Sequence, residues 1–317
     1  MKYYLQIFYL FYVSLSTYYT LKISDDSFKV IFRIIVLTGI VITGIGFLQY
    51  FLHNLYSIPG AKTLYSLFAN RNLFSSVVVI LMPFSLYEWF SDKQKLWRIF
   101  SLISLIFSSA TIGIIKARSS WLAVILATLF IFSILLLFKH LNKKKWKTIL
   151  PISGILFVVF IAGYFSTKFV KDYQGHKKPW FGKVLHEETD AERKQIIDSK
   201  SFNIRWQAWK RTFPMIGEHF FTGVGPGNWK IIYPKYGIQG TRAERGFQQY
   251  IRPHNDYLWI FSENGIVCFL FYVAIFGIAI YHTIRAMRRN KNVALNSCLL
   301  WGIITYMVIS FFSFPIC

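Results

Sequence analysis

Acidic residues and cysteines are scarce in this chain. Its 317 residues include 14 aspartates and glutamates against 36 lysines and arginines, and only three cysteines. Cys268, Cys298 and Cys317 lie in or next to apolar stretches without the spacing of metal ligands, and an odd number gives no disulfide framework. We therefore expect the cysteines to be packing residues.

The chain also lacks the alternation of apolar and polar residues that is typical of strands in soluble proteins. Hydrophobic residues make up 54% of it, and its mean hydropathy is +0.41, which indicates a polytopic membrane protein. Eight stretches come close to the ~20 apolar residues that cross a bilayer as a helix. The predicted spans are Tyr3 to Leu21 (retained rather than cleaved as a signal peptide), Ile34 to Leu52, Leu73 to Phe90, Ile99 to Ile115, Trp121 to Phe138, Ile149 to Phe165, Tyr257 to Tyr281 and Val293 to Phe312.

The net charge of +22 would suit nucleic-acid binding, but the placement of the basic residues indicates a membrane topology instead. Four short loops hold 15 of the 36 basic residues, the short segments that alternate with them hold five, and the long loop after the sixth span holds the other 16. Basic residues concentrate in cytoplasmic loops. We therefore expect the N-terminus, His53 to Asn72, Lys116 to Ser120 and the long loop to face away from the cytoplasm, with no nucleic acid as a partner.

These patterns predict an all-α fold, a polytopic transmembrane helix bundle with one long extracytoplasmic loop. Residues 1–167 would hold the first six transmembrane helices, 168–253 the extracytoplasmic loop, and 254–317 the last two helices.

The second half of the long loop has helical periodicity. From residue 203 the order Asn-Ile-Arg-Trp-Gln-Ala-Trp-Lys-Arg-Thr-Phe-Pro puts Trp206, Trp209 and Phe213 on one helical face. The asparagine would cap this helix and Pro214 would end it. Because indoles favour the headgroup level, we expect a helix near 203–213 on the outer membrane surface, in contact with lipids, with Arg205 next to its apolar face.

A glycine-rich segment follows, Phe221-Thr-Gly-Val-Gly-Pro-Gly-Asn-Trp229. It has neither the Gly-Lys-Ser/Thr ending nor the preceding parallel strand of a nucleotide-binding loop. A tight turn over the membrane surface is the favoured interpretation.

A lone histidine lies where the long loop returns to the membrane, in Arg252-Pro-His-Asn-Asp256. Asn255 or Asp256 is suited to cap the next helix, whose positive end disfavours imidazolium. A neutral His254 could accept a proton from a hydroxyl group, and the alternative is an orienting or structural role. Asp256 could itself be the base, or only a cap. For Glu263, two turns further on, a buried salt bridge with an arginine is favoured over a chemical role.

The order of the motifs resembles the O-antigen ligase and O-antigen polymerase superfamily of bacterial envelope glycan transferases. The resemblance covers roughly Asn70 to Phe314. It rests on Asn70-Arg-Asn72, Ala117-Arg-Ser-Ser-Trp121, Asn203-Ile-Arg-Trp206, Gly223-Val-Gly-Pro-Gly-Asn228, and His254-Asn-Asp-Tyr-Leu258 followed by Glu263-Asn-Gly265. This chain has fewer predicted spans than the family, which would make it a shortened member or a fragment.

The resemblance implies transfer of an oligosaccharide from undecaprenyl pyrophosphate to an acceptor hydroxyl on the outer side of the bacterial inner membrane, without metal or nucleotide. Arg118, Arg205 and His254 match the functional positions of the family. A pyrophosphate leaving group gains negative charge, which Arg118, Arg205 and Arg252 would stabilise. The structural alternatives are snorkelling at a helix end for Arg118, an ion pair or lipid headgroup contact for Arg205, and a solvated loop for Arg252.

Three acceptors stay open: lipid A core, the growing glycan, and Ser or Thr of a protein. They correspond to a ligase, an O-antigen or exopolysaccharide polymerase, and a protein O-oligosaccharyltransferase. No metal or other cofactor is expected, because the outward segment His53 to Asn72 has no carboxylate and Asp25-Asp26 falls on the cytoplasmic side. The competing class is a non-catalytic polysaccharide transporter or flippase, which would need charged residues or broken helices near mid-membrane; the spans show little of either.

Overall fold

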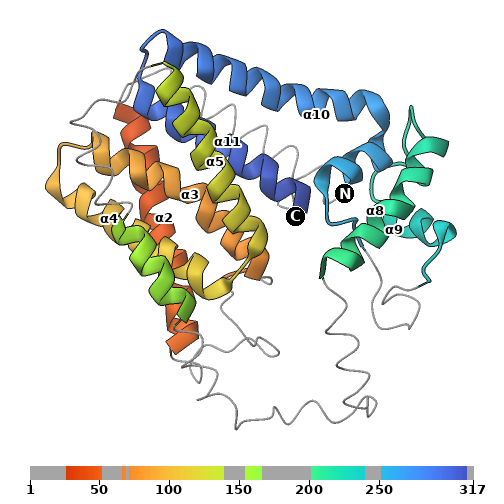
Figure 1. The fold of residues 1–317 in the computed structure, drawn as a ribbon, viewed down its shortest axis with the longest axis horizontal. Helices are drawn as coiled ribbons and strands as arrows, with labels where there is room; N and C mark the ends of the chain where they lie inside the picture. The colour runs from red at the N-terminus through yellow and green to blue at the C-terminus, as the bar shows by residue number, and fades with distance from the viewer. Residues whose placement is uncertain are drawn as a thin grey trace. The chain divides into compact units, whose positions relative to one another are not determined.

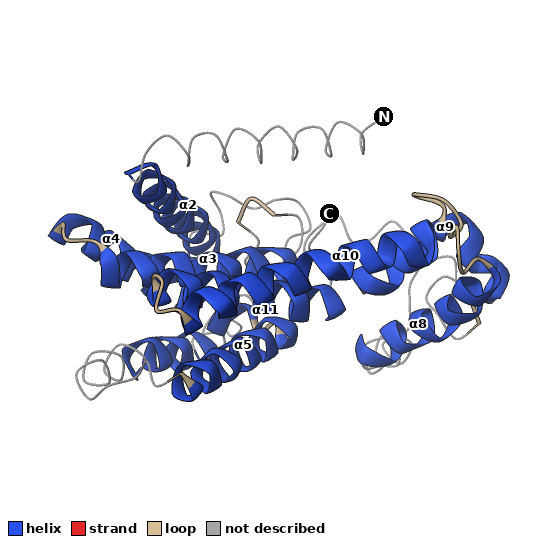
Figure 2. Ribbon diagram, turned by 90° about the horizontal axis from the view of Figure 1, so that it is seen from above, coloured by secondary structure: helices blue, strands red, loops and turns tan. Residues whose placement is uncertain are grey.

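The computed structural model describes residues 26–51, 66–68, 71–138, 154–165, 201–239 and 251–312 of the chain. Within these ranges the secondary structure is helical and no strand occurs, as Figure 2 shows by colour. Six helices in this part of the chain are long and apolar enough to cross a membrane. The prediction of an all-α, multi-pass membrane protein is therefore confirmed. The predicted span Tyr3 to Leu21 lies outside the described residues.

The long helices coincide with predicted spans. Their bounds are α2 (Asp26–Phe51), α3 (Arg71–Ser91), α4 (Lys95–Ile115), α5 (Arg118–Leu137), α10 (Asp256–Arg288) and α11 (Val293–Phe312). Several helices begin before the first residue of the predicted span, because helical hydrogen bonding propagates into the polar flanks once the apolar turns have formed. A shorter apolar helix, Gly154–Phe165, covers the end of the sixth predicted span.

By its internal contacts the chain divides into two compact units. The first is made of residues 1–115 and 142–163, and its long helices are α2, α3 and α4. The second is made of residues 116–141 and 164–317. It contains α5, α10 and α11 together with α8 (Ser201–Glu218), α9 (Trp229–Ile232) and the 3-10 turn η2 (Tyr233–Tyr236).

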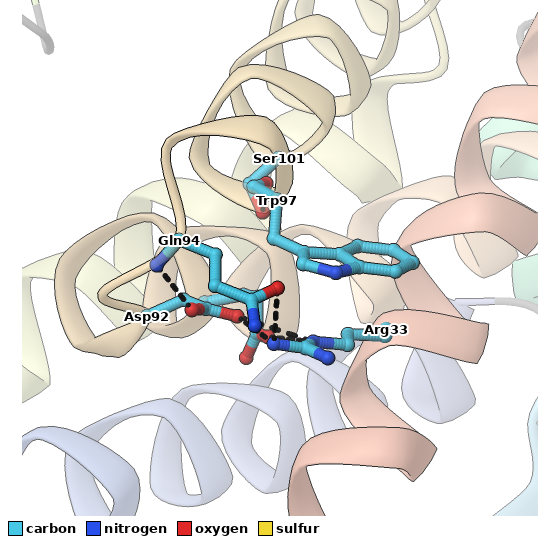
Figure 3. A network of polar contacts seen from close by, with 6 residues as sticks. Arg33, Asp92, Gln94, Trp97 and Ser101 are labelled. Atoms are coloured by element: carbon cyan, nitrogen blue, oxygen red, sulfur yellow. Dashed lines mark hydrogen bonds and ion pairs between the residues drawn. The ribbon is translucent and has the colours of Figure 1, made fainter.

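A polar cluster ties the helix ends of the first unit together (Figure 3). Arg33 near the start of α2 donates from Nη2 to Asp92 Oδ2 at 2.8 Å and to Gln94 Oε1 at 3.2 Å. The guanidinium also lies 3.5 Å from Glu88 Oε1 and 4.7 Å from the ring centre of Trp97. The start of α2 therefore lies beside the end of α3, so the two helices are antiparallel, as consecutive spans must be.

In the second unit, α5 and α10 run parallel to each other and antiparallel to α11. This follows from an apolar cluster in which residues late in α5 and α10 meet residues early in α11. Its buried members are Ile131, Ile134, Met287 and Leu300. The first segment of α10 lies beside the end of α11, because the Tyr257 hydroxyl donates to the carbonyl of Met307 at 3.1 Å and its ring lies 6.4 Å from that of Phe311.

Helix α10 is broken at Gly265, which is a correction to the single continuous span predicted from Tyr257 to Tyr281. The glycine has φ 75° and ψ −179°, far from helical values, so a short segment over residues 256–264 precedes a long one over 266–288. Figure 1 shows the change of direction at the end of α10 that lies nearest α8. Only glycine adopts this backbone conformation readily.

Helix α8 is longer than the predicted helix near 203–213 and faces differently. It runs from Ser201 to Glu218 with Pro214 inside it, so the proline does not end it. Met215 follows the proline and is 0% exposed, and its burial holds the chain in the helix. The predicted aromatic face is also divided: Trp206 and Phe213 are 47% and 52% exposed, whereas Trp209 is buried at 5%. Trp209 faces the interior because its indole has partners there.

Candidate functional site

His254 lies in a sharp turn immediately before α10. Its φ of 58° is in the left-handed region, which few residues other than glycine adopt. The next residue, Asn255, is extended and caps the helix, because its Oδ1 accepts from the backbone N–H of Leu258 at 3.0 Å. Of the two caps that the sequence suggests, the structure thus uses Asn255. The helix cap and the turn together fix the backbone position of His254, and therefore the point from which its imidazole extends.

Trp209 joins α8 to the loop that carries His254. Its Nε1 donates to the carbonyl oxygen of Pro253 at 2.8 Å, and its ring meets Phe311 near the end of α11 at 5.4 Å between centroids. Arg205 lies one turn earlier in α8 and therefore on the same side of the helix as Trp209. The bond to Pro253 thereby brings Arg205 next to His254.

The surroundings of His254 keep its ring neutral. Burial and the nearby guanidinium of Arg205 together lower the pKa of His254 from 6.5 to about 4. Burial also lowers the pKa of Arg205, although an arginine stays charged at any physiological pH. At neutral pH the pair is therefore an uncharged imidazole beside a fixed positive charge. Such a pair can accept a proton at one atom and bind an anion at the next.

Arg252 and Arg118 take different places around this pair. The Arg252 guanidinium lies over the ring of Trp259 in the first segment of α10, 4.3 Å from its centre. This cation–π contact anchors Arg252 close to the turn that holds His254. Arg118 is the first residue of α5, with an exposed side chain. Among the described residues, none forms a hydrogen bond or an ion pair with the Arg118 side chain.

The two carboxylates expected to support the site, Asp256 and Glu263, lie at opposite ends of the first segment of α10. Asp256 is its first residue and is fully buried, where the positive end of the helix favours a carboxylate. Glu263 is 4% exposed, and none of the arginines in the described part of the chain forms an ion pair with it. Its Oε2 accepts from the backbone N–H of Gly227 at 2.8 Å, and its Oε1 from that of Trp229 at 3.1 Å. The expected salt bridge is thus replaced by hydrogen bonds to the glycine-rich segment, because those buried N–H groups need acceptors.

Sequence reasoning missed the residues that assemble this site. Trp209 looked like a lipid-facing residue, and Trp229 was only the end of a glycine-rich motif. In the structure Trp229 is fully buried, its Nε1 donates to Thr212 of α8 at 3.2 Å, and its ring stacks on Tyr233. The available signal was the presence of four tryptophans in a largely polar loop, since buried indoles need both packing and a hydrogen-bond acceptor.

No group of three or more His, Cys, Asp or Glu side chains able to hold a metal ion occurs among the residues that the structure describes. The expectation that no metal takes part stays a prediction for experiment.

A family model described as "O-Antigen ligase" matches residues 102–273, which is more than half of the chain. The matched region includes Arg118, Arg205, His254 and Glu263, with both segments of the broken helix represented. Among curated proteins, none matches this chain.

Proposed function

Because the chain belongs to the O-antigen ligase family, whose members are glycosyltransferase- or ligase-like membrane enzymes, we propose that it joins a lipid-linked glycan to an acceptor hydroxyl. The proposed donor is undecaprenyl pyrophosphate carrying an oligosaccharide. The proposed location is the bacterial inner membrane, with the site on its outer side. The observation that carries the proposal is the pairing of a neutral His254 with the cation of Arg205 at one end of the helix bundle.

In the proposed reaction the acceptor oxygen forms a bond to the anomeric carbon of the donor sugar. The bond from that carbon to the phosphate oxygen breaks, and undecaprenyl pyrophosphate leaves with the electron pair. The hydroxyl proton passes to the ring of His254. Direct displacement inverts the configuration of the anomeric carbon.

Arg205 serves two purposes in this scheme. Its guanidinium stabilises the charge that develops on the leaving pyrophosphate. In the free protein the same charge depresses the pKa of His254. Pyrophosphate bound against Arg205 offsets that charge, so the pKa of His254 rises when the donor is bound and the ring becomes a better base at the step that needs one. Arg252 and Arg118 are the further candidates for contact with the pyrophosphate.

The test uses the full chain reconstituted in liposomes with purified lipid-linked donor. His254→Ala should reduce the transfer rate roughly 10²-fold or more, the usual contribution of a positioned acid–base group. His254→Gln retains hydrogen bonding but cannot take up a proton, so a general base leaves Gln as inactive as Ala. Near-normal rates in both variants would refute the role of His254. Loss of wild-type activity on addition of a chelator would refute the metal-free mechanism.

The pH dependence gives a second check on the same assay. For the wild type, kcat/KM should fall on the acid side near pH 4, where the free protein's His254 becomes protonated, rather than near 6.5. A fall of kcat/KM near pH 6.5 would show that burial and Arg205 do not lower the pKa of the base.

The acceptor is identified by the products that a deletion strain loses. Deletion of a ligase leaves lipid-linked glycan that is not joined to lipid A core. Deletion of a polymerase leaves single-unit caps, and deletion of a protein O-oligosaccharyltransferase leaves unglycosylated protein. If the protein is a transporter or a flippase, the reconstituted chain should transfer no glycan to any acceptor.

A further inference from the structure

The glycine-rich segment and the break in α10 form one seam. The backbone N–H of Val224 donates to the carbonyl of Ser262, and that of Gly225 to the carbonyl of Glu263, both at 2.9 Å. On the other side of the break, the N–H of Ile266 donates to the carbonyl of Phe220 at 2.9 Å. The segment from 220 to 225 therefore takes up backbone groups that an unbroken helix would satisfy internally.

The seam requires glycine on both sides. A Cβ on Gly223 would lie 2.4 Å from the carbonyl carbon of Glu263, and a Cβ on Gly265 would lie 2.0 Å from the carbonyl oxygen of Phe221. Both glycines also have positive φ. The two motifs that the sequence shows separately, Gly-Val-Gly-Pro-Gly and Glu-Asn-Gly, are thus the two halves of one contact.

The carboxylate of Glu263 extends this seam to α8. It accepts from the N–H groups of Gly227 and Trp229, while the Trp229 side chain reaches α8 by its bond to Thr212. At the other end of the segment 256–264, Trp209 of α8 holds Pro253. Helix α8 is therefore clamped to this segment twice, once just before His254 and once at Glu263.

We propose that Glu263 is a positioning residue, which locks the glycine loop 223–229 to the broken end of α10 and thereby sets the place of Arg205 against His254. This inference rests on the proposed function in one respect: the proposed function assigns Arg205 and His254 their chemical roles. Without the carboxylate, the N–H groups of Gly227 and Trp229 lose their acceptor, and α8 keeps its bond to Pro253 and its packing against Leu258 and Trp259 but loses the link at Glu263. Arg205 then gains freedom to move away from the imidazole.

The distance between Arg205 and His254 has an observable that does not depend on catalysis. The charged groups beside His254 are Arg205 from α8, and Arg252 and Asp256 on its own segment; Asp256 in turn interacts with the titratable Tyr306 of α11. Of these, Arg205 is the one that lowers the pKa of His254 by its charge. Removal of Arg205 from its place must therefore raise that pKa.

The experiment is an NMR titration of the full chain in nanodiscs with ¹³C-labelled histidine. The chain has seven histidines, and the signal of His254 is the one that His254→Gln removes. In the wild type this histidine should titrate near pH 4. In Glu263→Gln it should titrate higher by about one unit, the spread that folded proteins commonly impose. Glu218→Gln is the matched control, because Glu218 bonds Tyr236 outside the seam and should leave the titration unchanged.

Hydrogen exchange of the same variants tests the lock itself. Amides of residues 223–229 should exchange faster in Glu263→Gln than in the wild type or in Glu218→Gln. An unchanged exchange rate, or faster exchange with an unchanged His254 titration, overturns the proposal. If Glu263→Gln does not fold, Glu263→Asp, which keeps the charge on a shorter side chain, provides the same comparison. Neither measurement uses transfer activity, so a wild type without transferase activity would refute the proposed function while leaving the lock and its effect measurable.

Discussion

Replacement of Gly265 by alanine should destabilise the protein more than any ordinary glycine substitution in its helices. The backbone there has φ 75° and ψ −179°, which costs a residue other than glycine about 1–3 kcal/mol. The new Cβ would also lie 2.0 Å from the carbonyl oxygen of Phe221 and 2.9 Å from the carbonyl carbon of Thr222. Because these are backbone atoms, the seam must move apart, and overpacking of this kind typically costs about another 1–3 kcal/mol. The expected loss is thus about 2–6 kcal/mol.

Gly277 provides the control in the same helix. A Cβ at this position meets nothing within 4 Å, and the residue has ordinary helical backbone angles. Gly277→Ala should therefore be neutral or should stabilise the helix by about 0.5–1 kcal/mol, because alanine loses less backbone entropy on folding. The two variants make the same chemical change in α10, but only Gly265→Ala is expected to destabilise the protein.

Unfolding by SDS titration in mixed micelles, followed by tryptophan fluorescence, measures the free energy of unfolding of both variants. Gly265→Ala should also speed hydrogen exchange of the amides of Val224, Gly225 and Ile266, which form the seam. If Gly265→Ala is as stable as Gly277→Ala and keeps its seam amides protected, the break in α10 is not held by the contact described, and the argument built on it fails.

Three further predictions concern the first unit, the topology and the donor site. Arg33→Met should reduce the free energy of unfolding by about 3 kcal/mol, because Glu88 is only 2% exposed and would lose its cation; a loss within 0.5 kcal/mol would show that the cluster is not structural. A cysteine introduced near Arg242 should react with an impermeant thiol reagent from outside the inner membrane, whereas one near Lys144 should not; the reverse pattern would place the proposed site in the cytoplasm. Arg118→Ala should lower turnover of pyrophosphate-linked donor in correctly inserted protein, with only partial rescue by lysine, and full activity of Arg118→Ala would remove it from the site.

The family resemblance and the membrane class were both readable from the chain. Apolar stretches announce spans because the bilayer core tolerates no other backbone structure, and α11 coincides with its predicted bounds from Val293 to Phe312. The cap at Asn255 was also foreseeable, since side-chain capping depends on a few consecutive residues. Whether His254 and Arg205 catalyse transfer stays a prediction, although Arg205 lies close enough for its charge to lower the pKa of His254.

The errors share one physical cause. Trp209 and Glu263 were assigned partners by local periodicity and charge, as a lipid-facing indole and as one half of a salt bridge. Their actual partners are backbone groups far along the chain, the carbonyl of Pro253 and the N–H groups of Gly227 and Trp229. A backbone donor or acceptor leaves no mark in the sequence, because almost every residue carries one.

The sequence by itself determined that the protein spans a membrane, which stretches are helical, and which short motifs flank them. These properties follow from hydrophobicity and local hydrogen bonding, which act over a few helical turns. Only the tertiary structure decided that α10 breaks at Gly265, that the glycine loop fits into that break, and that Arg205 lies beside His254. Those outcomes depend on close contacts between segments some 40 to 50 residues apart, where the lack of a side chain at Gly223 and Gly265 matters as much as any side chain present.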